Sequence, residues 1–324
     1  MKKVILLTHI EDLDGIGAAA ILKRFYDQKN EYYYFYYYSY YNTFIDLICK
    51  AIIKDFHLLY ITDIGFNNSF LSFFQGKHEI FKTLNYQKIK RKFKRIHYLD
   101  HHLIDERDKK FMKSILKDFH HKINNICASE IVNRYLNRKF GWKDEVSIKI
   151  AKLANEIDQN KSTTMSDRLH RVVVANQENL WNLYKITNLL SKGKFENPWI
   201  YKQHEKRLKL EEMELDRVLK NLKEFETEGY KIIVSYSEIF TTGAIIKYLY
   251  NNLKADIYLS INKNQVSIRS HTLNVRNIAL KFGGGGHKYR SGFYYENVMT
   301  SQGELNPKFI REFDQIIKKY KDDL

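Results

Sequence analysis

The chain has 324 residues, 44% of them hydrophobic, which is enough for the cores of one large domain or two ordinary ones, and we expect two. Because the first thirty residues lack a signal-peptide pattern and no run of eighteen apolar residues occurs, we expect a soluble cytoplasmic protein and no membrane partner. The formal net charge of +16 favours an anionic partner, although a biased, lysine-rich composition would give the same charge.

Cysteine usage indicates neither a disulfide framework nor a zinc site. Cys49 and Cys127 lie in helical or apolar stretches, with no CxxC or Cys/His spacing near them. We therefore expect two reduced cysteines in the core.

Short apolar runs alternate with helical stretches along the first part of the chain. In order, we expect a strand over residues 3–8, a helix over 16–25, a strand over 31–41, a helix over 43–56 and a strand from residue 58. The tyrosine-rich strand EYYYFYYYSYY has high β-propensity and no helical period; a stacking platform for bases is its functional alternative. Asp12, Asp14 and Asp63 each lie just past a strand.

The stretch RIHYLDHHLID, residues 95–105, carries an acid and two imidazoles at the end of another strand. Its apolar approach, residues 96–99, delivers Asp100, His101 and His102 in succession. Burying such groups inside a strand is costly unless they are paired or bind a metal, whereas at a strand's end two of the three can face one cleft. Strands that alternate with helices predict a mainly parallel sheet, and ligands bind at the carboxyl ends of such strands. The acid-bearing strand ends should therefore converge.

Residues 108–158 have a helical pattern that ends in a further acid. We expect Asp144 to cap the last of these helices, with Asp158 at its far end. The motif DFHH, residues 118–121, repeats an acid and a histidine pair but follows a charged helical stretch without a strand. We therefore expect DFHH to lie at the surface.

The rest of the chain predicts a connector and a second α/β domain. A long charged stretch, residues 204–228, indicates a connecting helix. Beyond it KIIVSYS, ADIYLSI and QVSIRS predict strands, and a helix over 275–282 and a run of four glycines follow. We place the catalytic domain at residues 1–192, the helical connector at 193–228 and the second domain at 229–324.

The carboxylates and the histidine pair are ligand types of a binuclear metal site. Oxygen ligands suit Mn²⁺ or Mg²⁺, and added imidazole shifts the preference toward manganese, iron, cobalt or zinc. Two such ions about 3.5–4 Å apart can hold a bridging water and neutralise the phosphate that it attacks. Asp12 and Asp14 by themselves would also fit a pair of acids that stabilise a helix N-terminus.

Five motifs, in this order, resemble the DHH phosphoesterase family with its DHH-associated C-terminal domain. They are HIEDLDG (residues 9–15), YITDIG (60–65), YLDHH (98–102), ANEID (154–158) and GGGGHKYRSG (283–292). The D-L-D-G and four-glycine forms look most like the NrnB-like oligoribonuclease (nanoRNase) branch, and less like RecJ, whose long inserted domains are missing. The resemblance implies an α/β fold of two domains: a parallel-sheet DHH catalytic domain and a smaller α/β substrate-binding domain.

The resemblance also implies the metal ligands. They would be His9 and Asp12 on one ion, Asp14, His101 and Asp158 on the other, and Asp63 as a bridge between both. Asp100 would support His101. The spacing of His9 and Asp12, H-x-x-D, is shorter than the family's H-x-x-x-D, so the resemblance supports His9 least.

A further set of residues would bind the substrate. His102 would face the substrate phosphate, and Arg269 would bind a phosphate with its guanidinium. The glycine run would form a phosphate cradle, with Gly284, Gly285, Gly286 and His287 across the cleft from the metals.

The implied activity is hydrolysis of short oligoribonucleotides to nucleoside monophosphates by a manganese-dependent phosphodiesterase, an exoribonuclease with two divalent ions. The related substrates 3′-phosphoadenosine 5′-phosphate and cyclic or linear dinucleotides stay open, as does a homodimer. A hypothesis of a different class is a non-catalytic basic nucleic-acid-binding protein, which would bind long strands with a steep salt dependence and no turnover.

Overall fold

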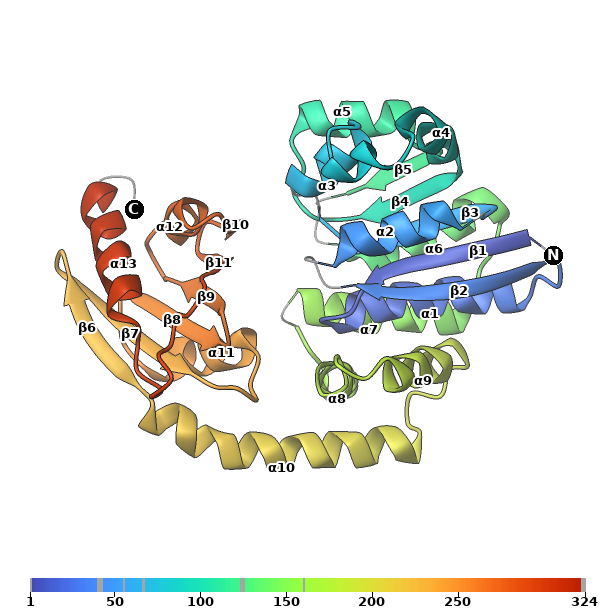
Figure 1. Ribbon diagram of the computed structural model, residues 1–324. Coiled ribbons are helices and arrows are strands. Elements are labelled where there is room, and N and C mark those ends of the chain that lie inside the picture. Colours follow the sequence, from blue (N-terminus) through green and yellow to red (C-terminus); the bar gives the residue numbers. More distant parts are fainter. Residues whose placement is uncertain are drawn as a thin grey trace. The chain divides into compact units, whose positions relative to one another are not determined.

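The computed structural model describes residues 2–39, 43–54, 56–65, 68–122, 126–159 and 161–321. It divides into two compact units, an N-terminal unit of residues 1–205 and a C-terminal unit of residues 206–324 (Figure 1). Helix α10 (Pro198–Lys220) passes through this boundary. Residues 204–220 are thus helical, as the charged sequence predicts, whereas residues 223–227, which we also expected in this helix, form the strand β6 (Lys223–Thr227) of the second sheet.

A parallel sheet forms the centre of the N-terminal unit. Its strands lie in the order β2-β1-β3-β4-β5, and every neighbouring pair runs parallel. The strands are β1 (Lys2–His9), β2 (Tyr32–Ser39), β3 (Leu58–Thr62), β4 (Ile96–Asp100) and β5 (Asp118–His121). The predicted α/β class with a parallel first sheet is confirmed.

Helices cover both faces of this sheet (Figure 1). Side chains alternate between the faces of β1, so that Val4 and Leu6 pack on one cluster while Ile5 and Leu7 pack on the other. The first cluster includes residues of α1 (Leu13–Asp27), α6 (Ala128–Phe140), α7 (Glu145–Asp158), α8 (Thr164–Val174) and α9 (Leu180–Ser191). The second includes residues of α2 (Phe44–Ile53), α3 (Asn68–Phe74), α4 (Tyr86–Lys90) and α5 (Glu106–Ile115), beside the short 3₁₀ turns Glu79–Lys82 and Arg91–Arg95.

The tyrosine-rich segment is the edge strand β2. Tyr34, Tyr36 and Tyr38 pack against the core of the first cluster, and the rings of Tyr36 and Tyr38 stack with centroids 5.6 Å apart. This packing favours the structural interpretation of the strand over a base-stacking platform. Tyr40 and Tyr41, which we included in the predicted strand, lie outside the described residues.

The expectation for DFHH was wrong. Residues 118–121 form β5, which pairs in parallel with β4, and their side chains are half-buried. The Phe119 ring stacks on the Tyr98 ring of β4 with centroids 5.2 Å apart. Four residues are too few to show a clear strand alternation in the sequence. This strand forms because it pairs and packs with β4, and the sequence of the segment alone does not indicate that contact.

The C-terminal unit holds a second sheet, in the order β10-β11-β9-β8-β7-β6, in which β7 and β8 alone run parallel among the described pairs. Its strands are β6 (Lys223–Thr227), β7 (Tyr230–Tyr236), β8 (Ile257–Asn262), β9 (Gln265–Arg269), β10 (Gly285–His287) and β11 (Arg290–Tyr294). Helix α11 (Thr242–Asn252) packs in one core cluster, and α12 (Val275–Lys281) and α13 (Pro307–Lys319) pack in another.

Two expectations from composition can be compared directly with the structure. Cys49 and Cys127 are both buried and free, as expected. Among the described residues, no helix combines the length and the apolar character needed to cross a membrane.

The N-cap at Asp144 generates a stability prediction. Its carboxylate accepts a hydrogen bond from Ser147 N at 2.8 Å and receives Arg24 Nε and Nη2 at 2.7 and 2.8 Å. We predict that Asp144→Ala lowers the free energy of unfolding by about 1–3 kcal/mol, because it removes a cap and leaves the Arg24 guanidinium without its carboxylate. Urea denaturation of the full chain measures this. Asp46→Ala, at an exposed acid in the first turn of α2, is the control and should change stability by less than about 0.5 kcal/mol.

Candidate metal centre

The carboxyl ends of three neighbouring strands bring the predicted ligands together. His9 is the last residue of β1, Asp63 follows β3 directly, and Asp100 ends β4. The order β2-β1-β3 means that the chain leaves β1 toward one side of the sheet and later continues on the other. Such a reversal opens a crevice at the carboxyl ends of the strands, where doubly wound proteins bind their ligands.

His9, Asp12 and Asp63 form a first group whose ligand atoms all lie within 4.8 Å of one another. His9 Nδ1 is 3.8 Å from Asp63 Oδ2, and both side chains are buried. The short spacing between His9 and Asp12 therefore does not prevent the His9 imidazole from lying beside Asp12 and Asp63. Gly15 allows the start of α1 to lie close to the end of β1, because a Cβ atom at position 15 would stand 2.2 Å from the carbonyl oxygen of His9.

His101 is the centre of a second group. Its Nε2 lies 3.4 Å from Asp63 Oδ1 and 3.6 Å from Asp14 Oδ2, and its Nδ1 lies 3.7 Å from Asp158 Oδ2. His102 also has a ligand atom within 4.8 Å of those of Asp63 and His101. The structure thus brings together all six residues that the resemblance implies as ligands, and adds His102 to them.

Helix N-termini hold two of these carboxylates in place. Asp12 caps α1 and accepts hydrogen bonds from the backbone N–H groups of Asp14 and Gly15 at 2.8 and 3.2 Å. Asp14 accepts from the first two amides of α6, Ala128 N at 2.6 Å and Ser129 N at 2.7 Å. The capping interpretation of this acidic pair therefore holds alongside the metal interpretation, because each carboxylate has further lone pairs that face the crevice.

Asp63 lies between both groups and has an unusual environment. Its backbone is in the left-handed region with φ of 57°, which a non-glycine residue adopts only at a cost. Its Oδ2 atom is buried and accepts no hydrogen bond from the described residues. A strained residue with an unsatisfied buried carboxylate oxygen fits a ligand that a cation would complete.

Asp100 contacts the other histidine than we expected. Its Oδ1 lies 2.8 Å from His102 Nδ1, and its Oδ2 accepts from His102 N at 3.1 Å and from Tyr98 OH at 2.8 Å. The prediction that Asp100 supports His101 is thus not what the hydrogen bonds show. The reason is geometric: the chain turns after β4, so the residue two positions on folds back over Asp100. Gly65 leaves room for this turn, since a Cβ atom there would stand 3.0 Å from His102 Cβ.

The clustered carboxylates of the site favour a bound cation. Burial, and then the charge of Asp63, raise the pKa of Asp12 to about 6 and that of Asp14 to about 7. Burial opposes protonation of His101, yet its contacts with Asp63 and Asp14 outweigh it and raise its pKa to about 10. The buried carboxylates thus attract whatever positive charge is near, and without a metal that charge is protons. Divalent ions fit a donor set of carboxylates and imidazoles of this kind.

Glu11 is a site residue that sequence reasoning missed. Its Oε2 lies 3.3 Å from His9 Nε2, and its backbone carbonyl accepts a hydrogen bond from Gln177 Nε2 at 2.7 Å. The carboxylate orients the His9 ring from the side opposite Asp63. Its place next to the ligand Asp12 was the one available signal, and no motif distinguishes it from a solvent-exposed acid.

Apart from His102, the predicted phosphate-binding residues lie in the C-terminal unit. Arg269 ends β9 and pairs in register with Arg290 of β11. Burial and the charge of Arg290 lower the pKa of Arg269 to about 10, and its guanidinium lies 5.8 Å from the centroid of the Tyr250 ring. The Arg269 Nε atom is buried and makes no hydrogen bond within the described part of the chain. Two adjacent arginines, for which the described residues supply no carboxylate partner, fit an anion site.

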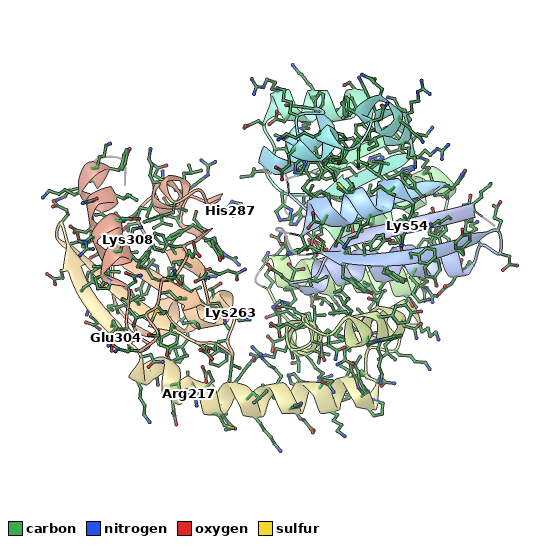
Figure 2. All side chains as sticks on the ribbon, in the orientation of Figure 1. Lys54, Arg217, Lys263, His287, Glu304 and Lys308 are labelled. Atoms are coloured by element: carbon green, nitrogen blue, oxygen red, sulfur yellow. The ribbon has the colours of Figure 1, made fainter. Side chains whose placement is uncertain are left out.

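The four glycines of the run, residues 283–286, differ in what requires a glycine at each position. A Cβ at Gly284 would stand 2.1 Å from the carbonyl oxygen of Gly292, and one at Gly286 would stand 2.7 Å from that of Arg290, so both are required by close packing on β11. Gly283 has a φ of 75°. At Gly285 a Cβ would meet no atom within 4 Å. His287 follows the glycines; it is the last residue of β10, the edge strand of the second sheet, and its side chain is exposed (Figure 2).

Solved structures with the same fold include exonucleases and a phosphodiesterase. RecJ of Thermus thermophilus, solved with Mn²⁺, is 14% identical with a TM-score of 0.63; the match covers 100% of this chain and 52% of RecJ, so the chain spans about half the length of that relative. Exonuclease RecJ bound to manganese is 13% identical with a TM-score of 0.59, over 100% of this chain and 91% of that one. The pGpG-specific phosphodiesterase PggH of Vibrio cholerae is 13% identical with a TM-score of 0.54, over 100% of both chains. No protein-family model and no curated protein sequence matches the chain. The fold is therefore shared with enzymes that cleave phosphodiester bonds.

The position of Asp63 in both groups yields a sharp prediction. We expect Asp63→Ala to lose bound manganese and to reduce hydrolysis by about 100-fold or more, because both groups lose the carboxylate that they share. Metal content and turnover are measured on the same sample. Asp105→Ala, at an exposed acid three positions beyond His102, should keep both. Near-normal turnover in Asp63→Ala would contradict a shared ligand.

Proposed function

We propose that this protein is a metal-dependent phosphoesterase that hydrolyses short oligoribonucleotides to nucleoside monophosphates. The observation that carries the proposal is the convergence of His9, Asp12 and Asp63 with His101 at one sheet edge. The fold shared with RecJ and PggH supports hydrolysis of a phosphodiester as the reaction class.

Two divalent ions, of which manganese fits the mixed oxygen and nitrogen donors, would occupy the site. His9 and Asp12 would hold one ion, Asp14, His101 and Asp158 the other, and Asp63 would touch both. When bound, such ions supply a hydroxide at neutral pH and neutralise charge on the phosphate.

The chain's own residues would orient the substrate. Burial opposes protonation of His102, but Asp100 outweighs it and raises the pKa of His102 to about 9. Because Asp100 binds Nδ1, the Nε2–H of His102 is left to donate to a phosphate oxygen. Asp100 and Tyr98 are thus positioning residues that aim His102.

The C-terminal unit would bind a substrate phosphate at a distance from the reacting bond. Arg269 and His287 are its cationic or polar contacts, and Gly285 offers backbone that a ligand can approach, since no protein atom fills the space beside it. Gly284 and Gly286 would shape this loop through their packing on β11.

Variants of Arg269 and His287 can distinguish substrate binding from metal binding. We predict that Arg269→Ala or His287→Ala keeps bound manganese and reduces turnover of oligonucleotides by about tenfold to 100-fold, because remote binding energy positions the reacting phosphate. Hydrolysis of bis-p-nitrophenyl phosphate should fall much less. The control is Lys308→Ala, at an exposed cation of α13 (Figure 2). Equal losses on both substrates, with metal retained, would reject the phosphate-binding role.

A dinucleotide phosphodiesterase is the second candidate function. It is favoured by the match to PggH, which covers both chains entirely and whose substrate by name is pGpG. A turnover assay with manganese distinguishes the candidates by comparing a dinucleotide, a pentanucleotide, a long strand, a cyclic dinucleotide and 3′-phosphoadenosine 5′-phosphate. Binding of long strands without any turnover would favour the non-catalytic alternative.

Substrate length gives the most specific prediction of the oligoribonuclease proposal. We expect RNA of about two to five residues to be hydrolysed much faster than strands of twenty or more, an estimate scaled to the few nucleotides that single-strand sites of this size engage. A competition assay at fixed salt between labelled short and long RNA, with products separated on a gel, measures the ratio. Degradation of the long strand at an equal rate per end would move the protein toward a RecJ-like exonuclease.

A further inference from the structure

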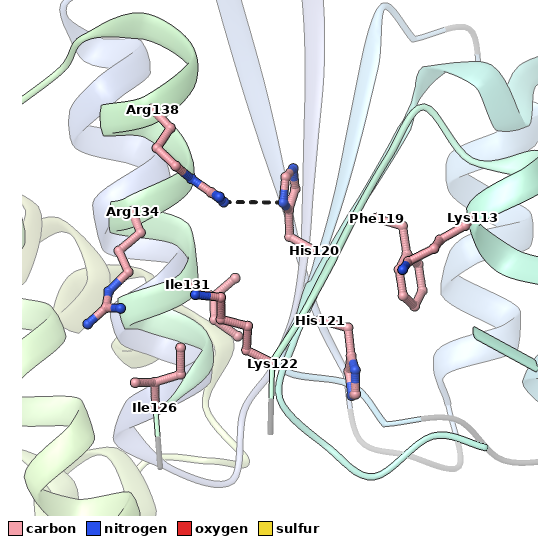
Figure 3. A pocket seen from close by; sticks show the side chains of 9 residues that line it. All are labelled: Lys113, Phe119, His120, His121, Lys122, Ile126, Ile131, Arg134 and Arg138. Carbon is pink, nitrogen blue, oxygen red and sulfur yellow. Dashed lines mark hydrogen bonds between the residues drawn. The ribbon is translucent and has the colours of Figure 1, made fainter. Parts of the chain in front are cut away.

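A basic pocket lies along β5, the strand at one edge of the parallel sheet (Figure 3). Its cavity volume is about 120 Å³. Strand β5 supplies three lining residues, α6 supplies three more, and Lys113, Lys122 and Ile126 complete the lining. In Figure 3, His120 points toward α6, and Phe119 and His121 point toward the opposite face of β5.

The described lining of the pocket is cationic and contains no acid. Lys113, Lys122, Arg134 and Arg138 join two imidazoles, and the remaining lining residues are apolar. Arg134 alone among these four pairs with a carboxylate of the described residues, that of Glu130 at 2.6 Å. Arg138 Nη2 lies instead 3.4 Å from His120 Nδ1, so an imidazole occupies the place where an acid would neutralise it.

Acids near the pocket are already engaged. Asp118, at the start of β5, is bound by His97 Nδ1 at 2.8 Å and by Lys139. Burial and the charge of Arg138 lower the pKa of His120, which agrees with an excess of positive charge around it. An anion is therefore the ligand that this lining would stabilise.

The pocket adjoins the candidate metal centre but shares no residue with it. His121 pairs in register with Asp100, and its Nε2 contacts the carbonyl oxygen of His102. The carboxyl end of β5 is thus one strand further along the edge that carries His9, Asp63 and Asp100. A ligand that reached from one site to the other would follow the edge of the sheet.

We propose that this pocket binds a phosphate group of the oligonucleotide substrate, outside the bond that is hydrolysed. Lys122 and Arg138 are its cationic contacts, and Ile126 and Ile131 offer an apolar wall to the adjoining sugar or base. The proposal rests on the proposed function for the identity of the substrate. An acidic peptide laid along the open edge of β5 is the competing occupant, and the test separates the two.

The first experiment measures binding without catalysis. A fluorescein-labelled RNA pentanucleotide is titrated with the full chain in EDTA, and fluorescence anisotropy gives Kd at several salt concentrations. The double variant Lys122→Ala/Arg138→Ala should bind about tenfold more weakly, and the slope of log Kd against log salt should fall by about 1.4, for two lost phosphate contacts on a single strand. Its circular dichroism spectrum and Tm should match those of the wild type.

The matched control removes the same charge elsewhere. Lys143→Ala/Lys152→Ala replaces two exposed lysines that do not line the pocket, and its Kd should stay within about twofold of the wild type. Equal weakening in both double variants, or no weakening in the pocket variant, would overturn the proposal. So would displacement of the RNA by a glutamate-rich peptide as effectively as by unlabelled pentanucleotide, or by inorganic phosphate at the same concentration.

Turnover distinguishes failure of this proposal from failure of the proposed function. Hydrolysis of bis-p-nitrophenyl phosphate with manganese should be unchanged in both double variants, while KM for the pentanucleotide should rise about tenfold in the pocket variant only. If the wild type hydrolyses neither substrate, the enzymatic function is rejected, and the binding result in EDTA still decides whether the pocket holds an RNA phosphate.

Discussion

The close approach of three carboxylates, those of buried Asp14 and Asp63 and of half-buried Asp12, is the constraint on which the rest of the N-terminal unit depends. Buried carboxylates repel each other and lose hydration, so each needs compensation. The fold supplies it in three ways: the N-termini of α1 and α6 donate amides, His9 and His101 lie against the carboxylates, and a cation would complete the balance. The N-termini of α1 and α6 thus meet part of this requirement.

Close approach of the backbone is the second condition of this arrangement. The start of α1 lies so near the end of β1 that only glycine fits at position 15, and the turn after β3 lies so near His102 that Gly65 leaves little space to spare. These glycines bring the loops after β1, β3 and β4 together. A side chain at either position would separate groups that must act within one site.

Part of the protein's positive charge is gathered at two places in the structure. In the C-terminal unit, Arg269 lies beside Arg290, and at the edge of the N-terminal sheet lie Lys122 and Arg138; none of these four pairs with a carboxylate of the described residues. Arg269 is half-buried, so an anionic ligand would offset the cost of burying its charge, whereas Lys122 and Arg138 are exposed. At these two places, part of the net charge of +16 is concentrated on neighbouring cations.

The sequence by itself determined that acids and histidines would lie at the ends of neighbouring strands, because apolar runs of strand length and the polar residues that follow them are local features. It also located the cap at Asp144 and, in the C-terminal unit, the strands β7, β8 and β9 and the helix α12. Only the tertiary structure decided that Asp100 binds His102, that Glu11 contacts His9, and that DFHH is a strand. Each of these depends on where a turn directs a side chain or on a neighbouring strand far along the chain, and no local pattern encodes such contacts. The basic pocket belongs to the same class, because its cations come from α5, from Lys122 just after β5, and from α6, and become neighbours only when the sheet has formed.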